Sequence, residues 1–180
     1  MHYVIVDLEA TCWEGRAPSR NEIIEIGAVL VNDACETISE FEQFVQPVQQ
    51  PILSNFCKEL TTIRQQDVDN APPFPEALKR FQQWFGMGHT PYLLCSWGLY
   101  DRNQFASDCK AHMLSKDWLA PHISLKHQYE AIAAMNRKVG LKHALEREGF
   151  TLDGTHHRGI DDARNISKIF AKYFERWQRP

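Results

Sequence analysis

Two acidic residues near the N-terminus, Asp7 and Glu9, have the types and the spacing to bind a divalent cation. They fall in an apolar run, residues 3–9, that predicts a β-strand. Because alternate side chains of a strand share a face, both carboxylates point the same way, with Cα atoms about 7 Å apart at roughly 3.3 Å per residue. Two acids beside so apolar a strand are costly to bury unless a cation or water compensates them. We therefore expect Asp7 and Glu9 to bind a divalent metal ion.

A third acid, Asp101, follows a second apolar run at residues 92–97. This run predicts a strand that is buried on both faces, and a helix is predicted from about residue 99. Asp101 then lies one helical turn before Phe105 and in line with Cys109, on the inward face of the helix. The sequence thus predicts a third inward-pointing carboxylate close to the end of a strand.

The last predicted helix begins with two adjacent acids, Asp161 and Asp162, which helical phase separates. Asp162 shares a face with an apolar stripe that consists of Ile166, Ile169, Tyr173 and Trp177. Asp161 shares a face with the polar residues Asn165, Lys168 and Lys172. We therefore predict that Asp162 is the buried acid, and that Asp161 is a first-turn or capping carboxylate exposed to solvent.

Hydrophobic periodicity indicates the elements that must position these acids. Three strands of an antiparallel meander are predicted at residues 3–9, 23–31 and 37–45. The period then changes from two to 3.6, which predicts a short helix near residues 53–60 and a second helix that begins after three prolines and carries its apolar residues at 77–85. Further elements are the strands 92–97 and 122–125 and the helices from about 99 and near 126–135, 141–148 and 160–177. A meander followed by alternating helices and strands predicts an α/β fold with a mixed sheet covered by helices.

Composition limits the class of protein. The 180 residues, 43% of them hydrophobic, predict a single domain over residues 1–180. The five cysteines are odd in number and form no Cys-x-x-Cys pair, so we expect reduced, mostly buried thiols. No apolar run approaches the roughly 20 residues of a membrane span, and the N-terminus lacks the features of a signal peptide, which predicts a cytoplasmic protein without a membrane partner. The net charge of −3 gives no general attraction to nucleic acid, so any phosphate-bearing substrate must be held locally.

Three stretches together resemble the motifs of the DEDDh (DnaQ-like) 3′-5′ exonucleases. These are Asp-x-Glu in the first strand, an Asp at the start of a mid-chain helix and His-x-x-x-x-Asp near the C-terminus, and the five motif positions hold Asp7, Glu9, Asp101, His157 and Asp162. Residues 9–12, 22–27, 60–61 and 159–165 further resemble the ERI-type branch. The resemblance spans nearly the whole chain. It implies a ribonuclease-H-like five-stranded sheet, in which the meander of strands 1–3 is joined by two parallel strands and flanked by helices.

The resemblance also implies a two-metal phosphodiester hydrolysis. Two Mg²⁺ or Mn²⁺ ions about 4 Å apart would neutralise the developing charge and activate the attacking water. By resemblance, Asp7 bridges both ions, Glu9 and Asp162 complete the first site, and Asp101 contributes to the second directly or through water. Without the ions four like charges are crowded together, so we predict that metal stabilises the fold.

His157 is the expected general base, because an unperturbed imidazole is largely neutral at pH 7 and can accept a proton from water. A lone loop histidine is more often a surface residue, and His156 is an adjacent competitor. The spacing favours His157, which lies five residues before Asp162, whereas His156 lies five residues before Asp161.

Residues for substrate binding are predicted mainly from the resemblance. It implies a pocket for the terminal nucleotide lined by Glu9, Ala10, Thr11, Leu60 and Thr61. Trp13 either stacks on a base or packs against its own loop. Scattered basic residues are candidates for phosphate contacts, and none is preferred: Arg16, Arg20, Arg64, Arg102, Lys126, Lys142 and Arg158.

Three functions fit these observations. The first is a metal-dependent 3′-5′ exonuclease that releases nucleoside 5′-monophosphates from the 3′ ends of single-stranded RNA or DNA, with RNA favoured by the ERI-type resemblance. The second is a hydrolase of short oligonucleotides, which needs no long binding groove. The third, a nucleic-acid-binding or proofreading partner without activity, is disfavoured because all five motif residues are present. No feature of the sequence indicates an oligomeric state.

Overall fold

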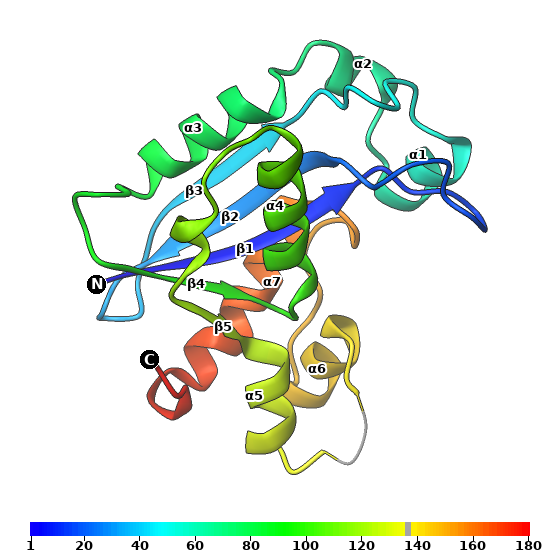
Figure 1. Cartoon of the computed structure of the whole chain (residues 1–180). Coiled ribbons are helices and arrows are strands. Elements are labelled where there is room, and N and C mark those ends of the chain that lie inside the picture. Colours follow the sequence, from blue (N-terminus) through cyan, green and yellow to red (C-terminus); the bar gives the residue numbers. More distant parts are fainter. Residues whose placement is uncertain (136–137) are drawn as a thin grey trace.

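A five-stranded mixed sheet forms the centre of the computed structural model, which describes residues 1–135 and 138–180 (Figure 1). Its strands are β1 (His2–Ala10), β2 (Ile23–Val31), β3 (Thr37–Phe44), β4 (Tyr92–Ser96) and β5 (His122–Ser124). Their order across the sheet is β3-β2-β1-β4-β5. The pairs β1–β2 and β2–β3 are antiparallel, whereas β1–β4 and β4–β5 are parallel. The predicted meander with two added parallel strands is confirmed.

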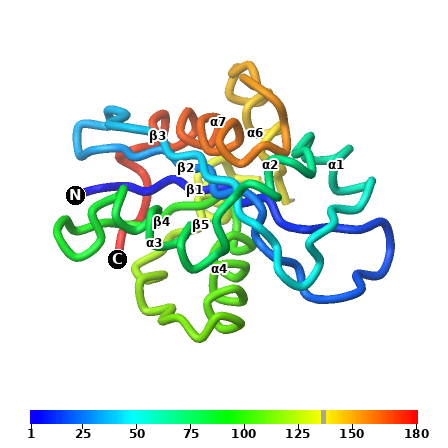
Figure 2. Tube along the Cα trace, turned by 90° about the horizontal axis from the view of Figure 1, so that it is seen from above, coloured from blue at the N-terminus to red at the C-terminus, as the bar shows by residue number. Residues whose placement is uncertain are grey.

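Helices cover both faces of the sheet. In chain order they are α1 (Asn55–Thr61), α2 (Gln65–Asp69), α3 (Phe74–Trp84), α4 (Tyr100–Ala111), α5 (Leu125–Ile132), α6 (Leu141–Glu148) and α7 (Gly159–Lys172). Two 3-10 turns, η1 (Asp117–Leu119) and η2 (Phe174–Arg176), complete the described elements. Figures 1 and 2 show α7 on one face of the sheet and α3 and α4 on the other, with α1 beyond the end of β1.

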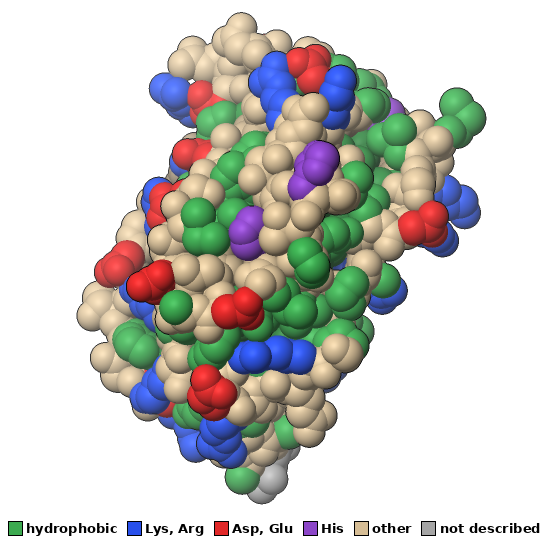
Figure 3. Space-filling model, turned by 90° about the vertical axis from the view of Figure 1, so that its left-hand side faces the viewer, with side chains coloured by type: hydrophobic (Ala, Val, Ile, Leu, Met, Phe, Trp, Pro, Cys, Tyr) green, Lys and Arg blue, Asp and Glu red, His purple; other side chains and the backbone are tan. Residues whose placement is uncertain are grey.

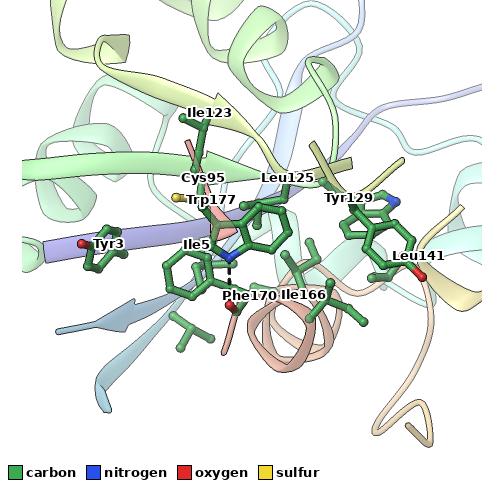
Figure 4. Packing of buried hydrophobic residues seen from close by; sticks show 14 of the residues in the cluster. Tyr3, Ile5, Cys95, Ile123, Leu125, Tyr129, Leu141, Ile166, Phe170 and Trp177 are labelled. Carbon is green, nitrogen blue, oxygen red and sulfur yellow. Dashed lines mark hydrogen bonds between the residues drawn. The ribbon is translucent and has the colours of Figure 1, made fainter. Parts of the chain in front are cut away.

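The alternation of β1 separates the two main cores, as its sequence predicts. Tyr3 and Ile5 belong to the core under α5, α6 and α7, whereas Val4, Val6 and Leu8 belong to the core under α3 and α4. The side chains of the first core gather between the sheet and α7 in Figure 4. Large apolar side chains buried in this way each contribute about 1.5–3 kcal/mol, so packing on both faces holds β1 rigidly in the middle of the sheet.

The C-terminal helix is shorter than its periodicity predicts. Helix α7 ends at Lys172, five residues before the predicted end, and the chain continues as a 3-10 turn, which is a common way for a helix to end. Trp177 nevertheless stays buried, because the chain turns back and its indole Nε1 donates a hydrogen bond to the Phe170 carbonyl at 2.8 Å. Figure 4 shows this bond as a dashed line.

Asn165 is fully buried, although its helical phase predicts a place on the polar face of the last helix. Its side chain accepts from the Asp153 amide at 3.0 Å and donates to the carbonyls of Asp153 and Asp161 at 2.8 and 2.9 Å. These hydrogen bonds satisfy the amide group and make its burial possible.

The start of α7 lies directly on β2. A Cβ atom added at Gly27 of β2 would lie 2.0 Å from the backbone carbon of Gly159, the first residue of α7. Only a glycine therefore allows this approach between helix and strand. The close contact fixes where the first turn of α7, with Asp162, meets the sheet.

The surface carries both signs of charge. On the side shown in Figure 3, acidic and basic side chains are interspersed between hydrophobic ones. This mixture agrees with the small net charge of −3. Within residues 1–135 and 138–180, no helix has the length and apolar character to cross a membrane.

Candidate active site

Three carboxylates from two elements meet at the end of β1. Oxygen atoms of Asp7, Glu9 and Asp162 all lie within 4.8 Å of one another. Asp7 and Glu9 share a face of β1, and Asp162 lies in the first turn of α7. Glu9 and Asp162 are buried, with 9% and 4% of their surface exposed. The predicted acid pair is thus completed by the acid that helical phase selects.

Asp101 supplies a fourth carboxylate to the same cavity. It lies in the first turn of α4, just after β4, and it is buried, as predicted. Its Oδ1 accepts a hydrogen bond from the backbone N–H of Leu8 at 3.1 Å. Since Leu8 stands between Asp7 and Glu9, this bond ties the start of α4 to the acidic end of β1.

Crowding and burial perturb these acids strongly. Burial, with the neighbouring Asp101, raises the pKa of Asp7 well above its ordinary value. Burial, with the neighbouring Glu25, raises the pKa of Glu9 to about 8, and burial raises the pKa of Asp101 to about 6. Each shift shows that the ionised form is destabilised without a counter-charge.

The four carboxylates fit a pair of divalent cations. Their donor atoms are all oxygens, which is the ligand type that hard cations such as Mg²⁺ and Mn²⁺ prefer. Two divalent ions would also balance the four negative charges that raise the pKa values of the site. The chemistry of the donor set therefore supports the predicted metal site.

Glu25 positions the helix that carries Asp162. It lies in β2 directly opposite Glu9, and it is fully buried. Its carboxylate accepts hydrogen bonds from the Gly159 backbone N–H at 3.0 Å and from Nε of Arg158 at 3.2 Å. An acid inside the apolar strand 23–31 is the sequence signal for this role, which the sequence analysis missed.

Both histidines of the last loop line the cavity. Nδ1 of His156 lies 3.0 Å from each carboxylate oxygen of Asp162, whereas His157 donates its backbone N–H to Asp162 Oδ2 at 3.0 Å. The two rings stack with centroids 4.0 Å apart. Burial, together with the neighbouring His156, lowers the pKa of His157, which favours the neutral imidazole that can accept a proton. The choice of His157 as general base stays a prediction.

Asp161 lies outside this arrangement, as its helical phase predicts, but its side chain is only 18% exposed and not open to solvent as predicted. Its carboxylate accepts from the Thr155 backbone N–H at 2.9 Å and pairs with Nη1 of Arg164 at 2.9 Å. It therefore shapes the loop before α7 without facing the other acids.

The predicted substrate residues divide into two groups. Glu9, Ala10 and Leu60 line the cavity, whereas Thr11, Trp13 and Thr61 do not appear in its lining. The hydroxyl of Thr11 accepts from the Glu22 backbone N–H, and that of Thr61 donates to the Cys57 carbonyl, both in buried positions. These two threonines support the walls of the cavity from behind.

Sequence reasoning did not assign several other residues that line the cavity, among them Trp97, Gly98, Tyr100, Lys126, Gly140 and Leu141. The first three are neighbours of Asp101 in the chain, so their place after a strand was a usable signal. Nothing in the sequence distinguishes the others from ordinary residues of a helix start. Lys126 was one of several basic candidates without preference.

Comparison with known proteins gives a consistent result. A family model, RNase_T, described as "Exonuclease", matches residues 4–170. The chain is 34% identical to ERI1 exoribonuclease 2 of Xenopus laevis over 95% of its own length and 28% of that protein. It is 33% identical to 3′-5′ exoribonuclease 1 of Homo sapiens over 95% of its own length and 52% of that protein. The chain thus spans about a quarter to a half of these two relatives.

A solved structure has the same arrangement of elements. The nuclease domain of 3′hExo, a DEDDh family member bound to rAMP, superposes with a TM-score of 0.89 at 33% identity. The match covers 97% of this chain and 92% of that domain.

Proposed function

This chain belongs to the RNase_T exonuclease family, and from that membership and the geometry of its site we propose that it is a metal-dependent 3′-5′ exonuclease. It hydrolyses phosphodiester bonds at the 3′ ends of single-stranded nucleic acid and releases nucleoside 5′-monophosphates. The observation that carries the proposal is the group of Asp7, Glu9 and Asp162, whose oxygens lie within 4.8 Å of one another, with Asp7 half-buried and the other two buried.

The acids hold the metal. Asp7, with Glu9 and Asp162, would hold one Mg²⁺ or Mn²⁺ ion, and Asp7 with Asp101 would hold a second. Bound at these residues, two such ions supply a more acidic water and stabilise negative charge on the phosphate and on the leaving 3′-oxygen. The structure supports the assignment because, without a cation, burial and the neighbouring carboxylates destabilise the ionised forms of Asp7 and Glu9 and raise their pKa values.

His157 accepts the proton of the attacking water in this proposal. Its lowered pKa keeps the ring neutral at pH 7. Its backbone N–H donates a hydrogen bond to Asp162, which holds the loop beside the acids. His156 instead holds the Asp162 carboxylate through Nδ1, which orients that acid.

RNA is the favoured substrate. The support comes from the relatives, which are named exoribonucleases, and from the similar nuclease domain that binds rAMP. Ala10 and Leu60 give the cavity an apolar wall at the end of β1, against which the terminal nucleoside would pack. Since the chain spans only part of the relatives, their other properties are not transferred to it.

The test is degradation of RNA and DNA oligonucleotides of the same sequence, labelled at the 5′ or the 3′ end, with Mg²⁺, Mn²⁺ or EDTA. We expect 5′-labelled strands to shorten from the 3′ end, faster for RNA, and 3′-labelled strands to release a labelled mononucleotide at once. Asp7→Asn removes the activity, whereas Asp69→Asn, an exposed acid in α2, leaves it unchanged.

Two results contradict the proposal. Activity that persists in EDTA or in Asp7→Asn would exclude a metal held by these acids. Cleavage confined to dinucleotides and trinucleotides would instead support the alternative, a hydrolase of short oligonucleotides.

A further inference from the structure

Lys126 is a cation on the wall of the acidic cavity. Of the residues that the structure describes, it is the only lysine or arginine in the lining. It is the second residue of α5, half-buried, and its backbone N–H donates to the Trp97 carbonyl at 3.0 Å. The end of β4 therefore fixes the start of α5, and with it the position of Lys126 beside the carboxylates.

Among the residues that the structure describes, the ammonium group of Lys126 has no acidic partner. Within the described ranges it forms neither an ion pair nor a side-chain hydrogen bond, although four carboxylates line the same cavity. Three other basic candidates, Arg20, Arg64 and Arg158, each pair with a carboxylate, and none of the remaining candidates lines the cavity. A half-buried cation that the protein itself leaves unpaired is well placed to bind an anion from outside.

The charge balance of the cavity points the same way. Four ionised carboxylates and two divalent cations cancel, so the metal-loaded acids are neutral overall. Lys126 then leaves one positive charge on the cavity wall. A phosphodiester carries one negative charge, which matches it.

The position of Lys126 indicates which phosphate it reaches. It lines the cavity together with Leu141 and Trp97, whereas Ala10 and Leu60 line it from β1 and α1. Figure 1 shows α5 and α6 together below the sheet and α1 beyond the far end of β1. The end of β1, which carries Asp7 and Glu9, thus lies between α5 and α1, the helices that supply Lys126 and Leu60.

From this arrangement we infer that Lys126 binds the backbone phosphate on the 5′ side of the scissile bond. The inference rests on the proposed function, because it takes the acids as the cleavage point. A strand whose last nucleoside packs on Ala10 and Leu60 has its scissile phosphate at the acids and extends in the 5′ direction toward Lys126. The residue is thereby a substrate-binding group for chains of three nucleotides or more.

The test compares Lys126→Gln with the wild type on a dinucleoside monophosphate, which has only the scissile phosphate, and on a pentanucleotide. We expect KM for the pentanucleotide to rise about tenfold with kcat nearly unchanged, since one charge-assisted contact is lost. The dependence of log kcat/KM on log salt should flatten by about 0.7, the value for one phosphate contact on a single strand. The dinucleoside monophosphate should show no difference.

Two variants separate this contact from general effects. Lys126→Arg keeps the charge and should retain most of the pentanucleotide affinity. Lys79→Gln removes the same charge from an exposed position on α3 that does not line the cavity, and should leave KM unchanged. Thermal unfolding of all three variants verifies that they fold.

Equal KM values for folded Lys126→Gln and wild type would overturn the inference. An equal loss on both substrates would also overturn it, because Lys126 would then act on the scissile phosphate. Failure of the proposed function is distinguishable, since in that case the wild type itself would not shorten the oligonucleotides.

Discussion

In the metal-free protein, ionised Glu9 should oppose folding, and Glu9→Gln should relieve that effect. The pKa of Glu9 is raised from its ordinary 4.5 to about 8 by burial and by Glu25. Between these pH values the folded protein keeps a proton that the unfolded chain releases, so stability falls as pH rises through this window and stays low above it. From pH 4.5 to pH 7 this window covers about 2.5 pH units, and each unit corresponds to about 1.36 kcal/mol. The free energy of unfolding of the metal-free protein is therefore lower by on the order of 3 kcal/mol at pH 7.

Urea denaturation in EDTA measures this directly. At pH 8, one further pH unit into the window, we expect Glu9→Gln to be more stable than wild type by on the order of 4 kcal/mol. This corresponds to a melting temperature roughly 8–16 °C higher for a chain of this size. At pH 5 the difference should fall below about 1 kcal/mol, because this pH lies only about half a unit above the unfolded-state pKa of 4.5. Saturating Mg²⁺ should reverse the order, since only the wild type keeps the full set of ligands.

The exposed Glu59→Gln of α1 is the control, and its stability should follow the wild type at every pH. The reasoning is refuted if metal-free Glu9→Gln is no more stable than wild type at pH 8. Burial and charge repulsion would then not be the forces that perturb this acid.

Three further predictions test the site and the core. His157→Ala should lower kcat by about 10²–10⁴-fold with little change in KM, and more than His156→Ala does; the opposite order in single-turnover kinetics would assign the base to His156. Gly27→Ala should lower the free energy of unfolding by about 1–3 kcal/mol and reduce the activity strongly, because the new methyl group would lie 2.0 Å from the α7 backbone. Gly140→Ala is the control for urea denaturation and should be far milder, because a Cβ atom there has no neighbour within 4 Å. Phe170→Ala should lower the free energy of unfolding by about 3–5 kcal/mol, and a loss under 1 kcal/mol would mean that the α7 core does not stabilise the protein as its burial indicates.

The acids of the site were predictable from periodicity. Alternation along β1 places Asp7 and Glu9 on one face, and helical phase selects Asp162 over Asp161. Both are local properties of the backbone, so they need no knowledge of tertiary contacts. The choice of Asp101 follows from the same reasoning at the start of α4.

Other features depend on contacts between distant elements. Helix α2 has five residues, which is too short for a 3.6-residue period to show. The role of Glu25 depends on the docking of α7 onto β2, and that of Lys126 on the parallel pairing of β4 and β5, which brings α5 to the cavity. The ring of His156, not that of His157, hydrogen-bonds Asp162, and the His157 backbone is left-handed with φ of 65°; the local sequence predicts neither feature.

The hydrogen bond between Glu25 and the amide of Gly159 joins residues 134 positions apart in the chain. A ribosome adds about 5–20 residues per second, so on the order of ten seconds separate the synthesis of these two partners. During that interval the acids of β1 exist without Asp162 and without either loop histidine. On the proposed function, the nascent chain gains its activity only after its last helix has emerged and docked onto β2.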